Sequence, residues 1–427
     1  MNRYKNIFTE KNLSRLMRPH DSRRYKKNIK RDRSLLLNDA LLAAFCPTTS
    51  FSSGVFSSTI KGKVCNSIKD YSKVLIIRAI TDYLQKTFKI KSPNRDRIVR
   101  GVIETLCDST PMYILKKDIK SFYENIEIAP LYELIFKKNL LPFYTKKLLR
   151  DFFSNFCNSS VGIPRGLGLS AVLAEIFLLE FDKKISLSNG VYKYFRYVDD
   201  ILIFCTTESA LKTIETNLTT YLPDRLEFNT KKSTSSITVA SEKFFTKKSI
   251  EYLGYEFKFE DSINQKRPRS VDISIATKKI KKIKTKIILS IKNFAKNHNE
   301  QLLLDRIQFI SSNYLVKRKG NEKIQRSRFV KSGIFYNYSL CGIYNGKDHA
   351  PPQFCSPTLE ELENLDRFYQ TVIGKNSKFR FITSTISPIT IKQLKDISFK
   401  KGYEKRMVVK FKEDRIKDIQ KVWKNAY

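Results

Sequence analysis

The chain has 427 residues, of which 41% are hydrophobic and 12% aromatic, so a sizeable core is possible and global disorder is excluded. Its 80 lysines and arginines stand against 42 aspartates and glutamates, a formal net charge of +38. This excess attracts a polyanion over long range and excludes a neutral housekeeping enzyme.

Nucleic acid and a membrane surface are the two polyanions to consider. The sequence contains no long apolar run, no signal-peptide pattern and no lipidation motif. The first 33 residues are strongly basic but lack an apolar stretch, which favours nucleic acid over a membrane. Seven cysteines without a C-x-x-C pair and only three histidines argue against a zinc site, and they predict reduced thiols in a cytoplasmic protein.

The N-terminal third is predicted to be mostly helical after a basic, polar arm that extends to about Arg33. Residues 35–45 are apolar enough for a short helix, and the Ser/Thr-rich residues 47–59 predict a loop. The spacing of apolar residues then predicts helices over 71–90 and 95–108.

The central part alternates between strands and helices. Residues 112–126 begin as a strand and end in a turn, and helical patterns follow through residue 156. The segment 162–182 predicts a Gly-rich loop that opens into a long apolar helix with Ser170 as its N-cap. Residues 192–205 form two apolar halves around two aspartates, which predicts a β-hairpin.

The C-terminal part becomes basic and helical from Asp261. Before it, the pattern predicts a helix over 208–222 and short strands in 226–233 and 250–259. After it, isoleucines recur every three or four residues between lysines over 277–294, which predicts an amphipathic helix.

Three carboxylates are expected to meet. A strand that ends at Asp118 and a hairpin that carries Asp199 and Asp200 can meet at one edge of a sheet. Like charges at close range repel, so a divalent cation is expected there, and Mg²⁺ takes oxygen ligands and suits phosphate substrates. Two such ions can activate a 3′-hydroxyl and stabilise a leaving pyrophosphate. An ordinary hairpin turn, where Asp is common, is the alternative.

Three other segments carry weaker signals. "GIPRGLG" (162–168) lets the backbone approach a ligand and precedes a helix N-terminus that favours an anion, although many loop-to-helix junctions share this pattern. "YLGYEF" (252–257) either grips a strand of nucleic acid or packs in the core. The lysine-rich helix either follows phosphates or is a solvated face.

In chain order, these segments resemble the palm of reverse transcriptases over about residues 94–260. "DIKSFYENI" resembles the first metal motif, "GIPRGLGLSAVLAEIFL" the templating-loop motif, and "YVDD" the Y-x-D-D box. "LEFNTKKS" is similar to the L-x-x-N-x-x-K-[ST] block and "YLGYEF" to the primer grip. Five blocks in the same order make this resemblance specific.

The resemblance implies an α/β (α+β) right-hand polymerase, with fingers, a palm built on a small antiparallel sheet, and a helical thumb. Three domain ranges follow from it. Residues 1–60 would be a basic N-terminal arm and the start of the fingers, 61–260 the fingers and palm, and 261–427 a basic helical thumb with a C-terminal extension.

The resemblance also implies roles for the residues around the metal. Asp118 and Asp199 would hold the catalytic Mg²⁺ ions with Asp200 assisting, and Ile119 would offer its backbone carbonyl. Tyr123 would lie under the incoming sugar, where its ring fills the space that a 2′-hydroxyl needs.

Nucleotide and primer contacts are implied in the same way. Lys232 would sit near the triphosphate and could protonate the leaving pyrophosphate, and Tyr197 would pack beside the primer terminus. Arg78, together with Arg95 or Arg97, is a candidate for binding the nucleotide phosphates. The primer strand would be positioned by Leu253, Gly254 and Tyr255.

Arg165 departs from the family pattern, because a glutamine commonly stands there. Leu169 likewise stands where a small residue or a proline is usual. Arginine is longer and charged, and it can bind a phosphate or a base edge bidentately. The change is compatible with restricted, repetitive or template-free synthesis.

The implied function is RNA-directed DNA polymerisation from dNTPs, with RNA and DNA as partners. One alternative is a template-independent or protein-primed deoxynucleotidyl transferase with the same fold, and another is a non-catalytic RNA-binding subunit. "DIKSFYENI" and residues 332–340 resemble the bacterial defence-associated, abortive-infection group, with retrons as a close competitor. That group implies antiphage immunity, a non-coding RNA or partner protein encoded nearby, and the possibility of an oligomer.

Overall fold

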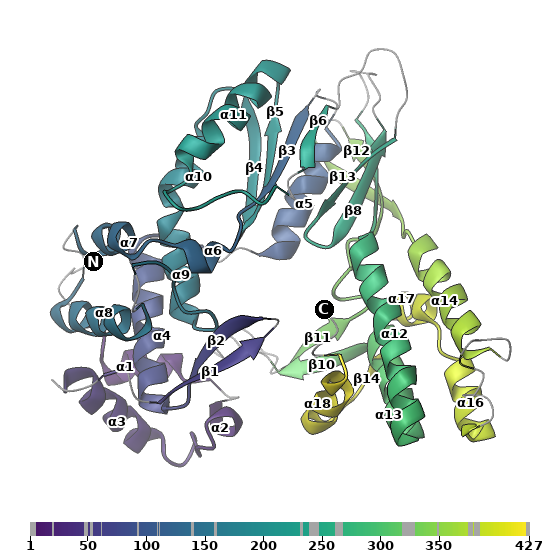
Figure 1. Cartoon of the computed structure of the whole chain (residues 1–427), viewed down its shortest axis with the longest axis horizontal. Coiled ribbons are helices and arrows are strands. Elements are labelled where there is room, and N and C mark those ends of the chain that lie inside the picture. Colours follow the sequence, from purple (N-terminus) through teal and green to yellow (C-terminus); the bar gives the residue numbers. More distant parts are fainter. Residues whose placement is uncertain are drawn as a thin grey trace. The chain divides into compact units, whose positions relative to one another are not determined.

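Figure 1 shows the structure, a computed structural model of the chain. It describes residues 6–18, 21–46, 50–51, 54–60, 62–91, 94–108, 110, 112–137, 141–157, 160–230, 234–238, 247–260, 268–317, 329–347, 350–374, 379 and 385–423. The chain forms two compact units. The first comprises Met1–Asn94, Met112–Val239 and Arg318–Arg328, and the second comprises Arg95–Pro111, Ala240–Lys317 and Phe329–Tyr427. These units are defined by packing, so the three functional ranges drawn from the sequence stay a prediction.

The N-terminal segment of the first unit is helical instead of forming a polar arm. It contains α1 (Glu10–Leu16), α2 (Asp21–Arg24) and α3 (Arg33–Phe45). The Thr9 hydroxyl accepts a hydrogen bond from the Asn12 N–H and caps α1. Leu13 and Leu16 are buried, and this short apolar face, hidden among many charges, is what folds the segment.

A hairpin and a long helix follow. β1 (Val55–Ile60) pairs antiparallel with β2 (Lys63–Ile68), so the predicted loop over 47–59 is wrong from Val55 onward. Ser and Thr next to Val and Phe suit a half-exposed strand as well as a loop. The predicted helix over 71–90 is α4 (Tyr71–Thr87), which begins where the Asp70 carboxylate accepts hydrogen bonds from the Ser72 and Lys73 N–H groups.

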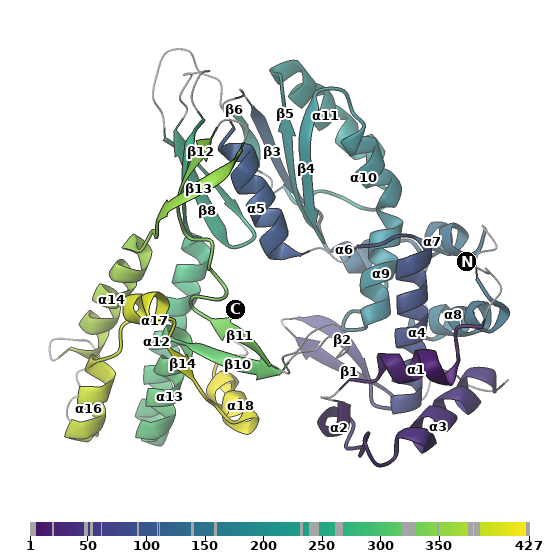
Figure 2. The same ribbon diagram turned by 180° about the vertical axis from the view of Figure 1, so that it is seen from behind.

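The central sheet of the first unit has four strands in the order β4-β5-β3-β6, and all its pairs are antiparallel. Its strands are β3 (Tyr113–Asp118), β4 (Val191–Tyr197), β5 (Asp200–Cys205) and β6 (Thr234–Thr238). Residues 201–205 of β5 are fully buried, which explains their uninterrupted apolar sequence. In both views, α10 (Leu179–Ser186) and α11 (Glu208–Tyr221) lie beside this sheet (Figures 1 and 2).

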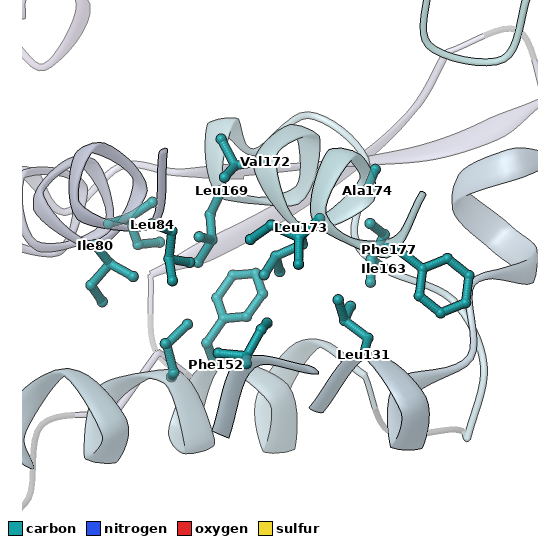
Figure 3. Packing of buried hydrophobic residues seen from close by; sticks show 14 of the residues in the cluster. Ile80, Leu84, Leu131, Phe152, Ile163, Leu169, Val172, Leu173, Ala174 and Phe177 are labelled. Carbon is teal, nitrogen blue, oxygen red and sulfur yellow. The ribbon is translucent and has the colours of Figure 1, made fainter. Parts of the chain in front are cut away.

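The helical part of the first unit is built around α9 (Gly168–Phe177). Figure 3 shows its side chains Leu169, Leu173 and Phe177 among apolar residues of other elements. These elements are α4, α7 (Ile128–Phe136) and α8 (Phe143–Phe156), while α6 (Phe122–Asn125) directly follows the end of β3. The N-cap of α9 is Leu167, so the prediction of Ser170 as N-cap is wrong. Ser170 is buried within the first turn.

The second unit combines helices with two sheets. Its antiparallel sheet has the order β13-β12-β9-β8-β7, and a smaller one has the order β11-β10-β14. The strands are β7 (Lys247–Tyr252), β8 (Tyr255–Glu260), β9 (Ser270–Ile275), β10 (Asn313–Lys317), β11 (Phe329–Gly333), β12 (Gly342–Lys347), β13 (Ala350–Ser356) and β14 (Val408–Val409). The helices are α5 (Arg95–Leu106), α12 (Thr277–Asn297), α13 (Glu300–Ser311), α14 (Glu360–Ile373), α16 (Pro388–Lys395), α17 (Phe399–Glu404) and α18 (Glu413–Lys421).

The predicted helix over 277–294 is therefore confirmed as α12, and the strands in 250–259 are confirmed as parts of β7 and β8. The strand predicted over 226–233 is reduced to an isolated bridge between Phe228 and Ile119, and residues 231–233 lie outside the described part. Among the described residues, no helix is both long and apolar enough to cross a membrane.

Candidate active site

Two of the three predicted aspartates face each other across neighbouring strands. Asp118 is the last residue of β3, Asp200 is the first residue of β5, and the two are direct partners in the antiparallel register. Directly opposed residues place their side chains on the same face of a sheet, with Cβ atoms about 5 Å apart. Only 5% of Asp118 is exposed. The structure thus brings two carboxylates to one strand end, as the sequence predicts.

Asp199 belongs to the tight turn between β4 and β5. Its carbonyl accepts a hydrogen bond of 3.0 Å from the Ile119 N–H, so the turn is fixed to the residue that follows Asp118. Val198, in the same turn, has a φ of 61°, which is unusual for a β-branched residue. Backbone strain of this kind persists where the surroundings determine it, often at functional sites.

Asn229 supports Asp118 from another segment. Its N–H donates to the Asp118 carbonyl at 2.7 Å, and its side-chain amide donates to Asp118 Oδ1 at 3.2 Å. This carboxylate therefore has a fixed orientation at the end of β3. Asn229 lies in the block "LEFNTKKS", but the sequence interpretation assigned a role only to Lys232 of that block, which is outside the described residues.

Arg196 holds the aspartate hairpin against two helices. Its guanidinium pairs with Glu175 of α9 at 2.7 Å and with Asp182 of α10 at 2.6 Å, and it donates to the Val198 carbonyl at 3.0 Å. Burial would lower the pKa of this guanidinium, but hydrogen bonds and charges of Asp182 and Glu175 outweigh burial and raise it. Arg196 is thus a permanently charged anchor beside the Asp199 turn.

The donor chemistry of the aspartates fits Mg²⁺. In the described part of the chain, no three acidic, histidine or cysteine side chains form a group that could hold a metal ion. However, Mg²⁺ is commonly bound by one or two carboxylates together with waters and substrate phosphates. Like charges directly opposite each other in a sheet are destabilising, and a cation at Asp118 and Asp200 would remove this repulsion.

The Gly-rich loop contacts the segment that follows Asp118. The Ile163 N–H donates to the Tyr123 carbonyl at 2.9 Å, and the Gly162 N–H donates to the Ile126 carbonyl at 2.8 Å. Gly162 has a φ of 97°, and a Cβ there would lie 3.2 Å from the Glu124 carbonyl oxygen. This close approach places Tyr123 and Arg165 side by side.

Arg165 lies over Tyr123 and is held by Glu124. The guanidinium carbon is 5.0 Å from the centre of the Tyr123 ring, and Nε and Nη2 donate to the two Glu124 carboxylate oxygens at 2.5 and 2.8 Å. Hydrogen bonding to Arg165 is the main reason why the pKa of Glu124 falls to about 2. Lys63 of β2 adds a second cation, 3.3 Å from Glu124. Sequence reasoning missed Glu124, although it directly follows Tyr123.

The backbone of Arg165 is joined to the β1–β2 hairpin. Its carbonyl accepts a hydrogen bond of 2.7 Å from the Asn66 N–H. A Cβ on the next residue, Gly166, would lie 2.5 Å from the Asn66 carbonyl oxygen, so only glycine fits there. Arg165 is therefore fixed by both its main chain and its side chain.

Arg78 is already engaged within the first unit. It forms a bidentate ion pair with the buried Asp21 at 2.5 and 2.8 Å, and Nη1 also donates to the Leu16 carbonyl at 3.0 Å. Its side chain is only 10% exposed. The nucleotide-binding role of Arg78 stays a prediction, and these contacts give it a structural role.

The predicted primer-grip residues form a tight turn in the second unit. Tyr252 pairs with Tyr255, and the two residues between them, Leu253 and Gly254, have φ values of 48° and 86°, as in type I′ turns. Arg95 Nε donates to the Leu253 carbonyl at 2.9 Å, and its guanidinium lies 4.7 Å from the Tyr255 ring centre. Tyr255 is fully buried, so its ring belongs to the core, whereas Leu253 and Gly254 in the turn are half-buried.

Comparison with known proteins adds an independent observation. Residues 69–257 match the family model of reverse transcriptases (RNA-dependent DNA polymerases). The chain contains a reverse transcriptase domain. The matched segment contains Asp118, Asp199 and Asp200, and the enzyme class of this domain is RNA-directed DNA polymerase, a nucleotidyltransferase. The α/β polymerase fold with small antiparallel sheets agrees with the prediction.

Similar solved structures include two of telomerase from Candida tropicalis. The apo enzyme, truncated from its C-terminal domain, has 18% identity and a TM-score of 0.33, covering 48% of this chain and 45% of that one. The complex with the TWJ fragment of telomeric RNA has 12% identity and a TM-score of 0.37, covering 87% and 64%. This chain thus spans less than two thirds of either telomerase chain. No curated protein matches the sequence.

Proposed function

We propose that the reverse transcriptase domain adds dNTPs to a nucleic-acid 3′ end by two-metal nucleotidyl transfer. Asp118, Asp199 and Asp200 would hold Mg²⁺, with the Ile119 carbonyl nearby. The metal would supply charge stabilisation at the attacking and leaving oxygens. The observation that carries this proposal is the direct register of Asp118 with Asp200 at the strand ends.

The residues of the chain would position the reactants. Asn229 orients the Asp118 carboxylate, and Arg196 fixes the hairpin that carries Asp199 and Asp200. Tyr123, under the guanidinium of Arg165, would bound the space for the sugar of the incoming nucleotide. Lys232 and the turn of Leu253, Gly254 and Tyr255 are proposed for the triphosphate and the primer strand.

Asp199→Asn and Asp200→Asn test the catalytic proposal. The purified protein, with any nucleic acid that it carries, is given Mg²⁺ and labelled dNTPs, singly and together. We expect each variant to lose at least about 100-fold in incorporation, because the charge that holds the metal is removed. RNA binding should be unchanged.

Asp224→Asn is a matched control, because Asp224 is an exposed acid in a turn of the same unit. Equal incorporation by wild type and both aspartate variants would refute the catalytic proposal. It would leave the non-catalytic RNA-binding subunit as the better interpretation.

A second candidate function is template-independent or protein-primed nucleotidyl transfer. The contact that favours it is the bidentate clamp of Glu124 on Arg165, which places a fixed cation where the family commonly has a glutamine. A product of simple composition, made after ribonuclease treatment, would support it. A product that matches a co-purified RNA would support templated synthesis.

We also propose a role in antiphage defence, with a non-coding RNA or a partner protein. This proposal rests on the resemblance of residues 118–126 and 332–340 to the defence-associated group. The Asp199→Asn variant also tests the defence proposal. Cells that express this variant should lose the protection against phage that the wild-type protein provides. Equal protection would refute a defence role of the polymerase activity.

A further inference from the structure

A cavity in the first unit is lined by cationic side chains and contains none of the proposed catalytic aspartates. Its volume is about 210 Å³. Three arginines line it: Arg18 after α1, Arg24 of α2 and Arg78 of α4. We call it the arginine cavity.

The carboxylates near the arginine cavity are already paired. Arg78 forms a bidentate pair with Asp21. Asp82, which also lines the cavity, accepts from Arg15 at 2.5 Å and from Lys86 at 2.6 Å. Among the described residues, neither Arg18 nor Arg24 forms an ion pair with a carboxylate, so the cavity has an excess of positive charge.

Arg18 gives the strongest indication of a ligand. Its Nε atom is buried and has no hydrogen-bond partner among the described residues. A buried N–H without a partner is costly, and native proteins rarely contain one without a reason. Burial, followed by the charge of Arg78, also lowers the pKa of the Arg18 guanidinium. A bound anion would supply the missing acceptor and favour the charged form.

The residues at the start of α9 also line the cavity. Gly166, Leu167 and Gly168 line it where α9 begins, and Leu167 makes no side-chain cap to that helix. The first N–H groups of a helix and its dipole favour an anion. The ring of Tyr25 lines the cavity as well, 5.5 Å from the Arg24 guanidinium carbon.

We propose that the arginine cavity binds a phosphate group, carried either by the backbone of a bound nucleic-acid strand or by a free nucleotide. Guanidinium groups bind phosphate bidentately, and the amides at a helix N-terminus favour an anion. Binding there requires no metal and no turnover, so this proposal is tested separately from the catalytic one.

Arg24→Gln is the principal test, because Arg24 is exposed and its replacement leaves the core intact. Arg31→Gln is the matched control: it also removes one charge, its side chain is 78% exposed, and it lies outside the cavity. Arg18→Gln with Arg24→Gln removes both unpaired cations. The midpoint of thermal unfolding of each variant is compared with that of the wild-type protein, to show that the variant is folded.

The full chain, freed of nucleic acid and kept in chelator, is titrated with a single-stranded RNA oligonucleotide at several salt concentrations, and separately with dATP. If the phosphate belongs to RNA, Arg24→Gln reduces the slope of log affinity against log salt by about 0.7, unlike Arg31→Gln. If it belongs to a free nucleotide, dATP affinity falls roughly tenfold in the double variant while the RNA slope equals that of the control. If Arg24→Gln and the double variant match the control with both probes, the proposal is wrong.

Discussion

Glu124 determines where the charge of Arg165 lies. Two hydrogen bonds to its carboxylate and the ring of Tyr123 hold the guanidinium in one orientation. In this orientation Nε and Nη2 face Glu124, and Nη1 takes no part in this ion pair. If Arg165 meets the incoming nucleotide as proposed, an arginine held in this way would select it by geometry as well as by charge.

Glu124→Gln should therefore change nucleotide selection without abolishing synthesis. We expect the relative use of the four dNTPs to change by up to about fivefold, because exposed ion pairs contribute about 1 kcal/mol or less. The change should have the same direction as that caused by Arg165→Gln. Competition between pairs of dNTPs measures it, with Glu133→Gln, an exposed acid on α7, as control.

The effect should not depend on pH in the usual range. The folded pKa of Glu124 is about 2, below its ordinary 4.5, so its contribution to stability is complete above pH 4.5 and is lost as pH falls through about 2. The selectivity difference between wild type and Glu124→Gln should be constant between about pH 6 and pH 9. A difference that varies in this range would contradict the assignment to the Glu124–Arg165 pair.

At the scale of elements, the aspartate hairpin depends on a buried ion network. Only 6% of the Arg196 side chain is exposed, and Tyr194 also donates to Asp182, at 2.7 Å. The network joins β4 to α9 and α10 and reaches the Val198 carbonyl in the turn. Because Arg196 is buried and its two carboxylate partners are partly buried, loss of the guanidinium leaves those carboxylates without a compensating charge.

Arg196→Met should destabilise the first unit by about 3–5 kcal/mol, because two carboxylates would remain partly buried without their cation. Urea denaturation measures this loss. Replacing Arg196, Glu175 and Asp182 together by apolar residues should recover much of it. A loss below about 1 kcal/mol in the single variant would show that the network is solvated and does not hold the hairpin.

Element types were predictable where apolar residues follow a clear period, as in α4, α12 and the hairpin of β4 and β5. The strand β1 was not, because Ser and Thr give no apolar period and its partner β2 is equally polar. The aspartates of the site were predictable from their motifs. Glu124 and Arg196 were not, because an ion pair between distant residues leaves no local pattern.

At the scale of the whole chain, each unit has its own buried centre. In the second unit, Asn313 is fully buried, and its side chain donates to the carbonyls of Gly402 and Met407 and accepts from the Phe335 N–H. This residue joins β10, α17 and the segment after β11. The sequence interpretation left residues 350–427 without a role, and several of the described residues in this range, such as Leu365, Tyr369 and Phe399, are fully buried in the second unit.

Gly402→Ala should destabilise only the second unit. A Cβ at Gly402 would lie 1.9 Å from the Ser311 carbonyl oxygen, so backbone has to shift, at a cost of about 1–3 kcal/mol. We expect thermal unfolding in two transitions. Gly402→Ala should lower the midpoint temperature of the transition of the second unit, and Arg196→Met that of the first unit. Gly168→Ala, where a Cβ meets nothing within 4 Å, is the control. If both variants lower one common transition, the units do not unfold separately.

The contact between Gly166 and Asn66 has a consequence for the evolution of the enzyme. Gly166 tolerates no side chain, because a Cβ there would meet the Asn66 carbonyl, so the loop cannot change its path here without disrupting the hairpin that it contacts. Position 165 is different, because its contact with the hairpin is made by its backbone carbonyl, which accepts from the Asn66 N–H and does not involve the side chain. Descendants of this chain can therefore replace the side chain at position 165 while the contact between the loop and the hairpin stays in place, and Glu124 is then the residue that loses its partner.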